Sequence, residues 1–143
     1  EQDRALEVIE VRKCMESWTS YFAAQRALPE DIRRMDEILA AMQANIDGLK
    51  PSENLDANLH IVIARATHNI VWLHLMQSIF DAMKEFQRGV WRAVYLTEED
   101  HRTLSAIVTA IRSRDAEAAR EAMTRHLTFA EQRSTAYVAR TPN

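Results

Sequence analysis

The sequence has few of the residues that make tight turns: two glycines and three prolines occur among its 143 residues. Hairpins and sandwiches need such turns often, so this scarcity argues against an all-β fold. No apolar run approaches the roughly 20 residues that span a bilayer, and no charged-then-apolar leader with a small-residue cleavage site is present. We therefore expect a soluble, cytoplasmic protein that does not contact a membrane.

The chain also lacks a strong excess of one charge, and it contains a single cysteine. Its formal net charge is −3, whereas a surface that neutralises many phosphates needs a strong basic bias. The chain by itself is therefore not predicted to bind nucleic acid. Cys14 cannot form an intrachain disulfide or a cysteine-based zinc site, and we expect it to be a small core or half-buried residue.

What the sequence does have is apolar residues at helical spacing. They make up 47% of the chain, enough for one core, so we expect a single domain over residues 1–143. Pro29 and a Thr97–Asp100 capping box mark the starts of two helices, and Gly48 marks the end of one. Ser52 is expected to cap the third helix. The predicted helices cover about 3–25, 29–48, 52–69, 70–95, 97–113 and 116–138. The fold class is therefore all-α.

Four polar side chains in these helices are candidates for a divalent metal site. Asp56 and His60 lie one turn apart, along one edge of the apolar stripe of their helix, so they can share an ion. His126 falls within the apolar stripe of the last helix, where a buried imidazole needs a partner. His101 lies towards the edge of a stripe that has Leu104 near its middle, and it is the doubtful member of the set.

Imidazole and carboxylate ligands together suit zinc, nickel or another late divalent ion. An Asp–His pair at this spacing is more often a capped or hydrogen-bonded pair than a metal site, and the inward-facing His126 favours the metal without settling the question. Both interpretations stay open at the level of the sequence.

Three segments of the chain resemble one known family. Glu10-x-Arg12 followed by Glu16 is similar to its opening E-x-R … E helix, and Asp56-x-x-Leu59-His60 is close to its D-x-x-F-H motif. The closing match runs from Ala110 to Ala119, with Met123 and His126-Leu127 following. The family is the FCD domain, the effector-sensing C-terminal half of FadR-type GntR transcription regulators.

This resemblance implies an antiparallel bundle of about six to seven helices around an effector pocket, often with a metal held by an aspartate and three histidines. Asp56, His60 and His126 fall on ligand positions. Leu104 occupies the remaining position, and His101 is one turn earlier. Either a local insertion brings His101 to the metal, or this site has lost one ligand and binds metal weakly or not at all. We favour the second interpretation.

The resemblance also implies the ligand and the partners. Metal-containing members sense small carboxylates such as hydroxy acids and sugar acids, and Arg12 matches the family arginine that would hold the anion. A salt bridge from Arg12 to Glu16 is an equally weighted alternative. Arg65, Arg88 and Arg92 are secondary pocket candidates that a solvated helix face explains more simply. A homodimer is expected, with DNA bound only through an N-terminal winged helix-turn-helix domain that this chain lacks.

Functions of other classes fit less well. A di-iron enzyme needs two Glu-x-x-His motifs, and Glu98-x-x-His101 is the only one. No serine or cysteine has a recognisable nucleophile context. We therefore expect no enzyme. The stronger alternative is a helical dimerisation module without a small-molecule ligand.

Overall fold

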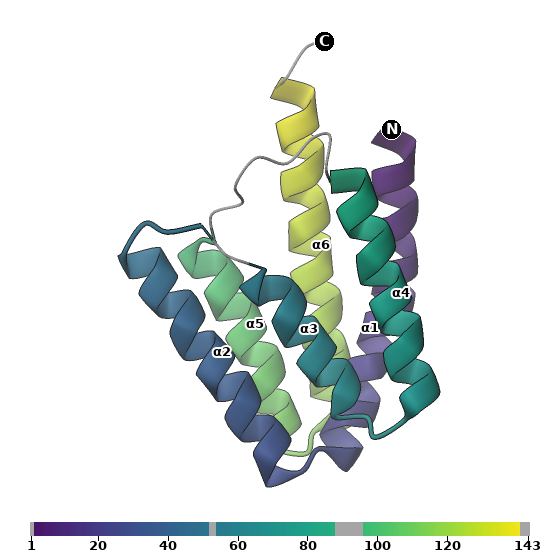
Figure 1. Cartoon of the computed structure of the whole chain (residues 1–143), viewed down its shortest axis with the longest axis vertical. Helices are drawn as coiled ribbons and strands as arrows, with labels where there is room; N and C mark the ends of the chain where they lie inside the picture. The colour runs from purple at the N-terminus through teal and green to yellow at the C-terminus, as the bar shows by residue number, and fades with distance from the viewer. Residues whose placement is uncertain (1, 52–53, 88–95, 141–143) are drawn as a thin grey trace.

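The computed structural model describes residues 2–51, 54–87 and 96–140. These residues form an all-α bundle without strands, as expected (Figure 1). The helices are α1 Gln2–Arg26, α2 Pro29–Asp47, α3 Leu55–Arg65, α4 Ile70–Gln87, α5 Glu98–Arg112 and α6 Ala116–Arg140.

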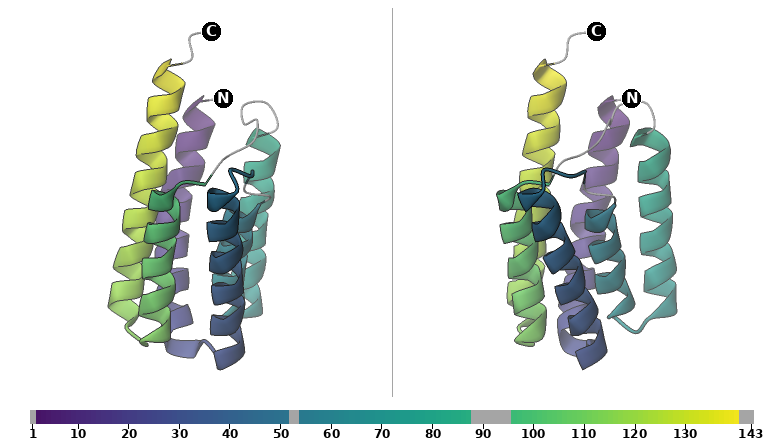
Figure 2. Two further views of the ribbon diagram at one scale, coloured as in Figure 1. Left: turned by 90° about the vertical axis from the view of Figure 1, so that its left-hand side faces the viewer. Right: turned by 60° about the vertical axis from the view of Figure 1, so that its left-hand side comes forward.

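Each helix runs opposite to the one before it, so the bundle is antiparallel (Figure 1). The longest helices, α1 and α6, pack along each other and extend beyond the others at the upper end of the view. α5 lies beside α6, as both views of Figure 2 show, and α2 packs on α3 and α5. α4 packs on α1 and α3. The middle of the bundle is therefore lined by α1, α3, α5 and α6.

The predicted apolar stripes of α5 and α6 form much of the main core. Leu104, Ile107 and Ile111 of α5 are fully buried, and Met123 and Leu127 of α6 pack with them. A smaller cluster lies around Ala64, Met76 and Phe80, where α4 covers α3. His60 lies against Phe80 of this smaller cluster, with the ring centroids 5.6 Å apart.

The third helix is shorter than predicted. It ends at Arg65 rather than near residue 69, because the next residues form a turn in which His68 has a left-handed φ of 51°. The Asn69 carboxamide oxygen then accepts hydrogen bonds from the backbone N–H groups of Val71 and Trp72 and so caps α4. Asparagine favours such caps over helix interiors.

At the other end of α3, Asn54 directly precedes the helix. The predicted cap Ser52 lies outside the described residues, as do 88–95, the last part of the predicted fourth helix, with Arg88 and Arg92. None of the described helices is long and apolar enough to cross a membrane.

The capping box predicted at the start of α5 is confirmed. Thr97 Oγ1 accepts from the Asp100 N–H at 3.2 Å, and Asp100 Oδ2 accepts from the Thr97 N–H at 2.8 Å. The same carboxylate pairs with Arg133 of α6. An N-cap of this kind stabilises a helix by about 1 kcal/mol, and the added pair fixes the first turn of α5 against α6.

The expectation for Cys14 was wrong, since this thiol is exposed. Arg12 and Glu16 both point into the bundle. A residue midway between them is about 200° from each at 100° per residue, so Cys14 lies on the opposite face of α1.

Candidate metal and effector site

The structure brings three of the four candidate ligands together. Asp56 and His60 come from the first two turns of α3, and His126 comes from the middle of α6. One possible ligand atom from each lies within 4.8 Å of the others. Asp56 Oδ1 is 3.7 Å from His60 Nε2 and 3.9 Å from His126 Nε2, and the two ring centroids are 5.3 Å apart.

These separations are close to those of a coordination sphere. With metal–ligand bonds of about 2.0 to 2.2 Å, two ligands of a tetrahedral zinc ion lie roughly 3.4 Å apart. The 3.7 and 3.9 Å separations therefore need an inward movement of only a few tenths of an ångström. The donor set of two imidazoles and one carboxylate fits a late divalent ion.

Each imidazole has a partner on its other nitrogen. His60 Nδ1 forms an ion pair with Glu16 Oε2 of α1, and His126 Nδ1 lies 2.9 Å from Thr103 Oγ1 of α5. Metal-binding histidines are usually oriented in this way, by a carboxylate or another polar group on the nitrogen that does not bind the ion. Both Nε2 atoms are thus left facing Asp56.

The sequence did not predict these two contacts. It gives Glu16 as a member of the opening motif and as a partner of Arg12, and its position one turn after Arg12 on the inner face is the signal that could have found the contact with His60. Thr103 gave no signal, because its contact depends on how α5 packs against α6.

His101 does not join the other ligands. Its Nε2 is 3.1 Å from the Leu39 carbonyl oxygen of α2, and its Nδ1 is 3.4 Å from Ser105 Oγ. Leu104 is fully buried in the main core, as the helical wheel predicted. His68 pairs with Asp31 in the first turn of α2 at 2.8 Å.

Of the two roles that the sequence left open for Arg12, the structure shows the salt bridge to Glu16. Arg12 Nε is 2.5 Å from Glu16 Oε1. Its guanidinium carbon lies 5.1 Å from the centre of the Phe80 ring. The side chain is buried, yet Nη2 has no hydrogen-bond partner among the described residues. A buried charged donor without a partner is costly, so this nitrogen is available to an anion.

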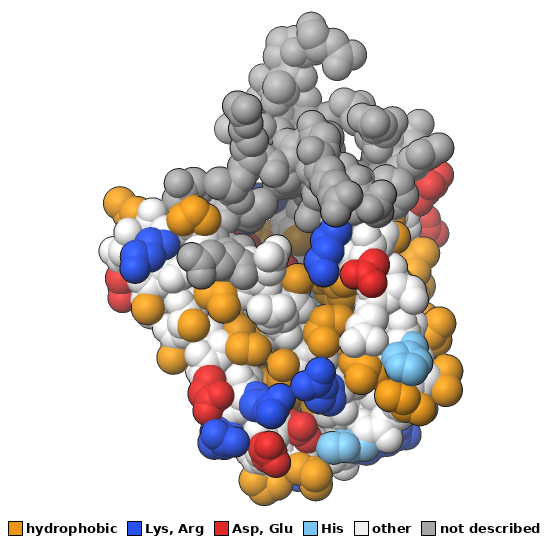
Figure 3. Space-filling view, viewed as in Figure 1, with side chains coloured by type: hydrophobic (Ala, Val, Ile, Leu, Met, Phe, Trp, Pro, Cys, Tyr) orange, Lys and Arg blue, Asp and Glu red, His pale blue; other side chains and the backbone are white. Residues whose placement is uncertain are grey.

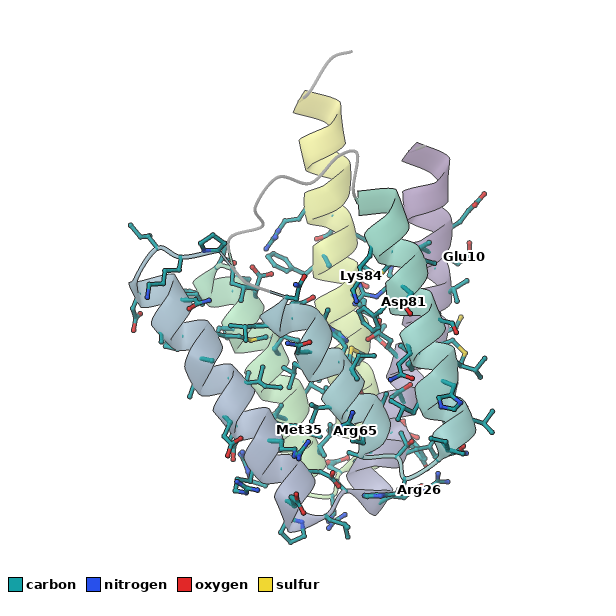
Figure 4. All side chains as sticks on the ribbon, in the orientation of Figure 1. Glu10, Arg26, Met35, Arg65, Asp81 and Lys84 are labelled. Carbon is teal, nitrogen blue, oxygen red and sulfur yellow. The ribbon has the colours of Figure 1, made fainter. Side chains whose placement is uncertain are left out.

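Arg65 has a different position. It is exposed and is the last residue of α3, at the lower end of that helix in Figure 4. It therefore belongs to the solvated face, which was the simpler explanation.

The two histidines of the site differ in their pKa and therefore in their charge. Burial alone would lower the pKa of His60, but the Glu16 and Asp56 carboxylates outweigh it and raise this pKa to about 9. Burial also opposes the charge on Glu16, yet Arg12 and His60 lower its pKa to about 2. His60 is thus an imidazolium held between two carboxylates.

His126 has the opposite behaviour. Burial, reinforced by the positive charge of His60, lowers its pKa to about 4, so the ring is neutral at neutral pH. The half-buried Asp56 stays ionised because hydrogen bonding and attraction from His60, with His126 and Arg12 adding to it, hold its pKa below the ordinary range against the effect of burial. The charges of Arg12 and His60 therefore balance those of Glu16 and Asp56.

Two solved structures have this fold. The chain of E. coli McbR/YncC has a TM-score of 0.81 at 13% identity, with 96% of this chain and 67% of that chain covered. Streptococcus agalactiae GntR has a TM-score of 0.72 at 19% identity, with 85% and 55% covered. These two likenesses show the helical-bundle fold. The FCD domain model matches residues 7–129, and the chain belongs to this family.

The curated relatives are named as regulators. The putative L-lactate dehydrogenase operon regulatory protein of Escherichia coli K12 is 30% identical over 131 residues, which are 89% of this chain and 50% of the relative. The E. coli Uxu operon transcriptional regulator is 29% identical, with 89% and 52% covered. The E. coli galactonate operon transcriptional repressor is 29% identical, with 79% and 50% covered. The chain spans about half the length of these regulators, and the expectation that it is not an enzyme agrees with them.

Proposed function

We propose that this domain, a single unit over residues 1–143, senses a small organic acid at the site around Asp56, His60 and His126. The observation that carries the proposal is the buried Arg12 Nη2, which has no hydrogen-bond partner among the described residues and whose guanidinium belongs to the same charged cluster. A carboxylate group would satisfy this donor with a charge-assisted hydrogen bond.

A divalent ion on Asp56, His60 and His126 would strengthen the preference for an anion. To bind it, His60 must release its proton, so a dication takes the place of one imidazolium charge. The cluster, whose charges otherwise balance, would then have one positive charge in excess. Zinc and nickel both accept this donor set.

Three protein ligands leave room for the effector on the ion. Leu104, which has no donor atom, stands at the position that the family pattern gives to a fourth ligand. A zinc ion would keep one open position, as in sites that bind substrate, and an octahedral ion would keep more. The names of two relatives refer to L-lactate and galactonate, which are both hydroxy acids. We therefore infer a hydroxy acid or sugar acid that binds both the ion and Arg12.

Dimerisation is the second part of the proposal. α4 exposes Ile70, Val71 and Leu75 on one face, and α1 exposes Val11 and Trp18. Apolar side chains line the outer edge of α4 in Figure 3. Exposed apolar side chains along a helix suggest an interface, and a second copy of the domain is the expected partner.

The parent protein would bind DNA through a domain outside this chain. Effector binding would then change the relative placement of two such domains in the dimer. The alternative remains a dimerisation module without a ligand, and ligand-dependent stability separates the two.

The test is thermal unfolding of the metal-stripped domain with zinc, nickel and a panel of hydroxy acids. A ligand at 100 times its Kd stabilises the folded state by about 2.7 kcal/mol. We expect the response to metal to vanish in His126→Ala and the response to acids to vanish in Arg12→Ala. The exposed His74→Ala and Arg65→Ala serve as matched controls and should respond normally. If neither metal nor acid changes the unfolding temperature of the unaltered domain, the dimerisation module is the better description.

A further inference from the structure

We propose that Thr103 is a positioning residue of this site: its hydroxyl oxygen accepts the Nδ1 proton of His126 and thereby fixes the tautomer whose bare Nε2 faces Asp56. The proposal deepens the metal site put forward above and rests on it for its consequence, although the tautomer itself can be measured without metal.

The assignment follows from the hydrogen bonds of one hydroxyl group. Thr103 Oγ1 lies 3.0 Å from the Glu99 carbonyl oxygen, 3.0 Å from the Asp100 carbonyl oxygen and 2.9 Å from His126 Nδ1. A carbonyl oxygen can only accept, and the hydroxyl has a single proton to donate. We assign this proton to the preceding turn of α5, where two carbonyl oxygens lie within reach and where threonine in a helix commonly donates. With the proton there, Oγ1 accepts from His126 Nδ1–H.

A neutral imidazole has one N–H group, so its second nitrogen then has a free lone pair. In His126 this nitrogen is Nε2, which lies 3.9 Å from Asp56 Oδ1. The opposite tautomer would place a proton between Nε2 and any ion bound by Asp56. A ligand nitrogen must be deprotonated before it binds, and Thr103 provides that state in advance.

The rest of the surroundings assign this role to Thr103 in particular. His60 has a carboxylate, Glu16, on its Nδ1, whereas the Thr103 hydroxyl is the partner on His126 Nδ1. Thr103 is buried, and it stands in the α5 segment whose first turn is fixed by Asp100 and Arg133. α5 therefore supports the site through Thr103, although the neighbouring Leu104 offers no ligand atom.

The first experiment measures the tautomer in the metal-free domain. Long-range ¹⁵N–¹H correlation spectra at neutral pH distinguish a protonated from a bare imidazole nitrogen. We expect protonated Nδ1 and bare Nε2 for His126. The near-isosteric Thr103→Val removes the acceptor and should shift the ring towards the Nε2–H form, while Thr103→Ser should keep the original form. An Nε2–H ring in the unaltered domain overturns the proposal without reference to any variant.

The second experiment measures the affinity for zinc by calorimetry. Loss of a group that orients a ligand costs about 10- to 100-fold in metal affinity, so we expect a loss in that range for Thr103→Val and rescue by Thr103→Ser. Thr109→Val, on the exposed face of the same helix, is the control for the substitution itself. Equal zinc affinity in Thr103→Val and the unaltered domain overturns the proposal.

The two experiments separate this inference from the proposed function. If the unaltered domain binds no zinc but shows the expected tautomer, the metal site fails and the role of Thr103 in setting the ring stands. If zinc binds and His126 has the opposite tautomer, the metal site stands and the proposed role of Thr103 fails.

Discussion

The two histidines of the site lie 5.3 Å apart in the same bundle but in different surroundings. His60 is a cation between Glu16 and Asp56, with Arg12 nearby, on the side formed by α1 and α3. His126 is a neutral ring with a hydroxyl partner on the side formed by α5 and α6. The comparison shows that one half of the site is held by balanced charges and must lose a proton to bind metal, whereas the other half is already in the binding form.

The strongest test of this contrast removes the charge that holds His60. In Glu16→Gln, both Arg12 and His60 lose their buried partner. Removing one member of a buried ion pair destabilises a protein by roughly 3 to 5 kcal/mol. We expect a loss of that size in the free energy of unfolding, measured with urea. Glu37→Gln, which breaks an exposed pair with Arg33, should cost less than about 1 kcal/mol. Equal losses of stability in the two variants would show that the buried charges around Glu16 contribute no more than an exposed ion pair.

The free energy of unfolding should depend on pH in two ways, one from each histidine of the site. The pKa of His60 is raised to about 9, so its stabilising effect is complete below about 6.5, the unfolded pKa, and is lost as the pH rises through 9. The pKa of His126 is lowered to about 4, so its contribution is complete above about 6.5 and is lost as the pH falls through 4. The Glu16 and Asp56 carboxylates raise the pKa of His60 against the effect of burial. Burial, then the positive charges of His60 and Arg12, lower the pKa of His126 against the effect of the same two carboxylates.

We therefore expect the metal-free domain to be most stable near the ordinary pKa of histidine and to lose on the order of 3 kcal/mol along the acid limb and along the alkaline limb of the pH profile. Urea unfolding across the pH range, in the presence of a chelator, measures both limbs. The acid limb should weaken in His126→Leu while the alkaline limb remains. An alkaline limb that disappears in this variant would contradict the division of the site into two halves.

Substitution of His126 should separate stability from metal binding. His126→Leu replaces a neutral, buried ring and removes its hydrogen bond with Thr103, a loss of about 0.5 to 1.5 kcal/mol. His60→Leu leaves Glu16 and Asp56 without their cation and should cost more. Both variants should lose zinc binding in calorimetry. Similar stability losses in the two would show that the histidines have equivalent surroundings.

Sequence reasoning anticipated much of the fold for identifiable reasons. Helical spacing predicted that Leu104 of α5 and His126 of α6 are buried, and Thr97–Asp100 predicted where α5 begins. The end of α3 was misplaced, because nothing in the apolar pattern shows that Asn69 caps the next helix.

For the site, the i, i+4 spacing and the helical wheel selected the three side chains that come together. They could not predict what each imidazole contacts on its other nitrogen. Glu16 and Thr103 lie on helices far from His60 and His126 in the sequence, so their contacts depend on the tertiary packing of four helices.

The smallest expected effect concerns Leu104, which lies on the uncharged side of the site next to Thr103. If this residue stands at a vacant ligand position, Leu104→His adds a third imidazole that is held like His126, without a carboxylate partner. We expect about a tenfold gain in zinc affinity, which corresponds to about 1.4 kcal/mol, and a metal-free domain that is less stable because a polar ring replaces a buried leucine. Leu104→Gln, which is polar and of similar size but has no imidazole, should lose stability without the gain. Calorimetry with zinc on all three proteins decides between the outcomes, and equal affinities would mean that the neutral half accepts no further ligand and that Thr103 is the whole contribution of α5 to the site.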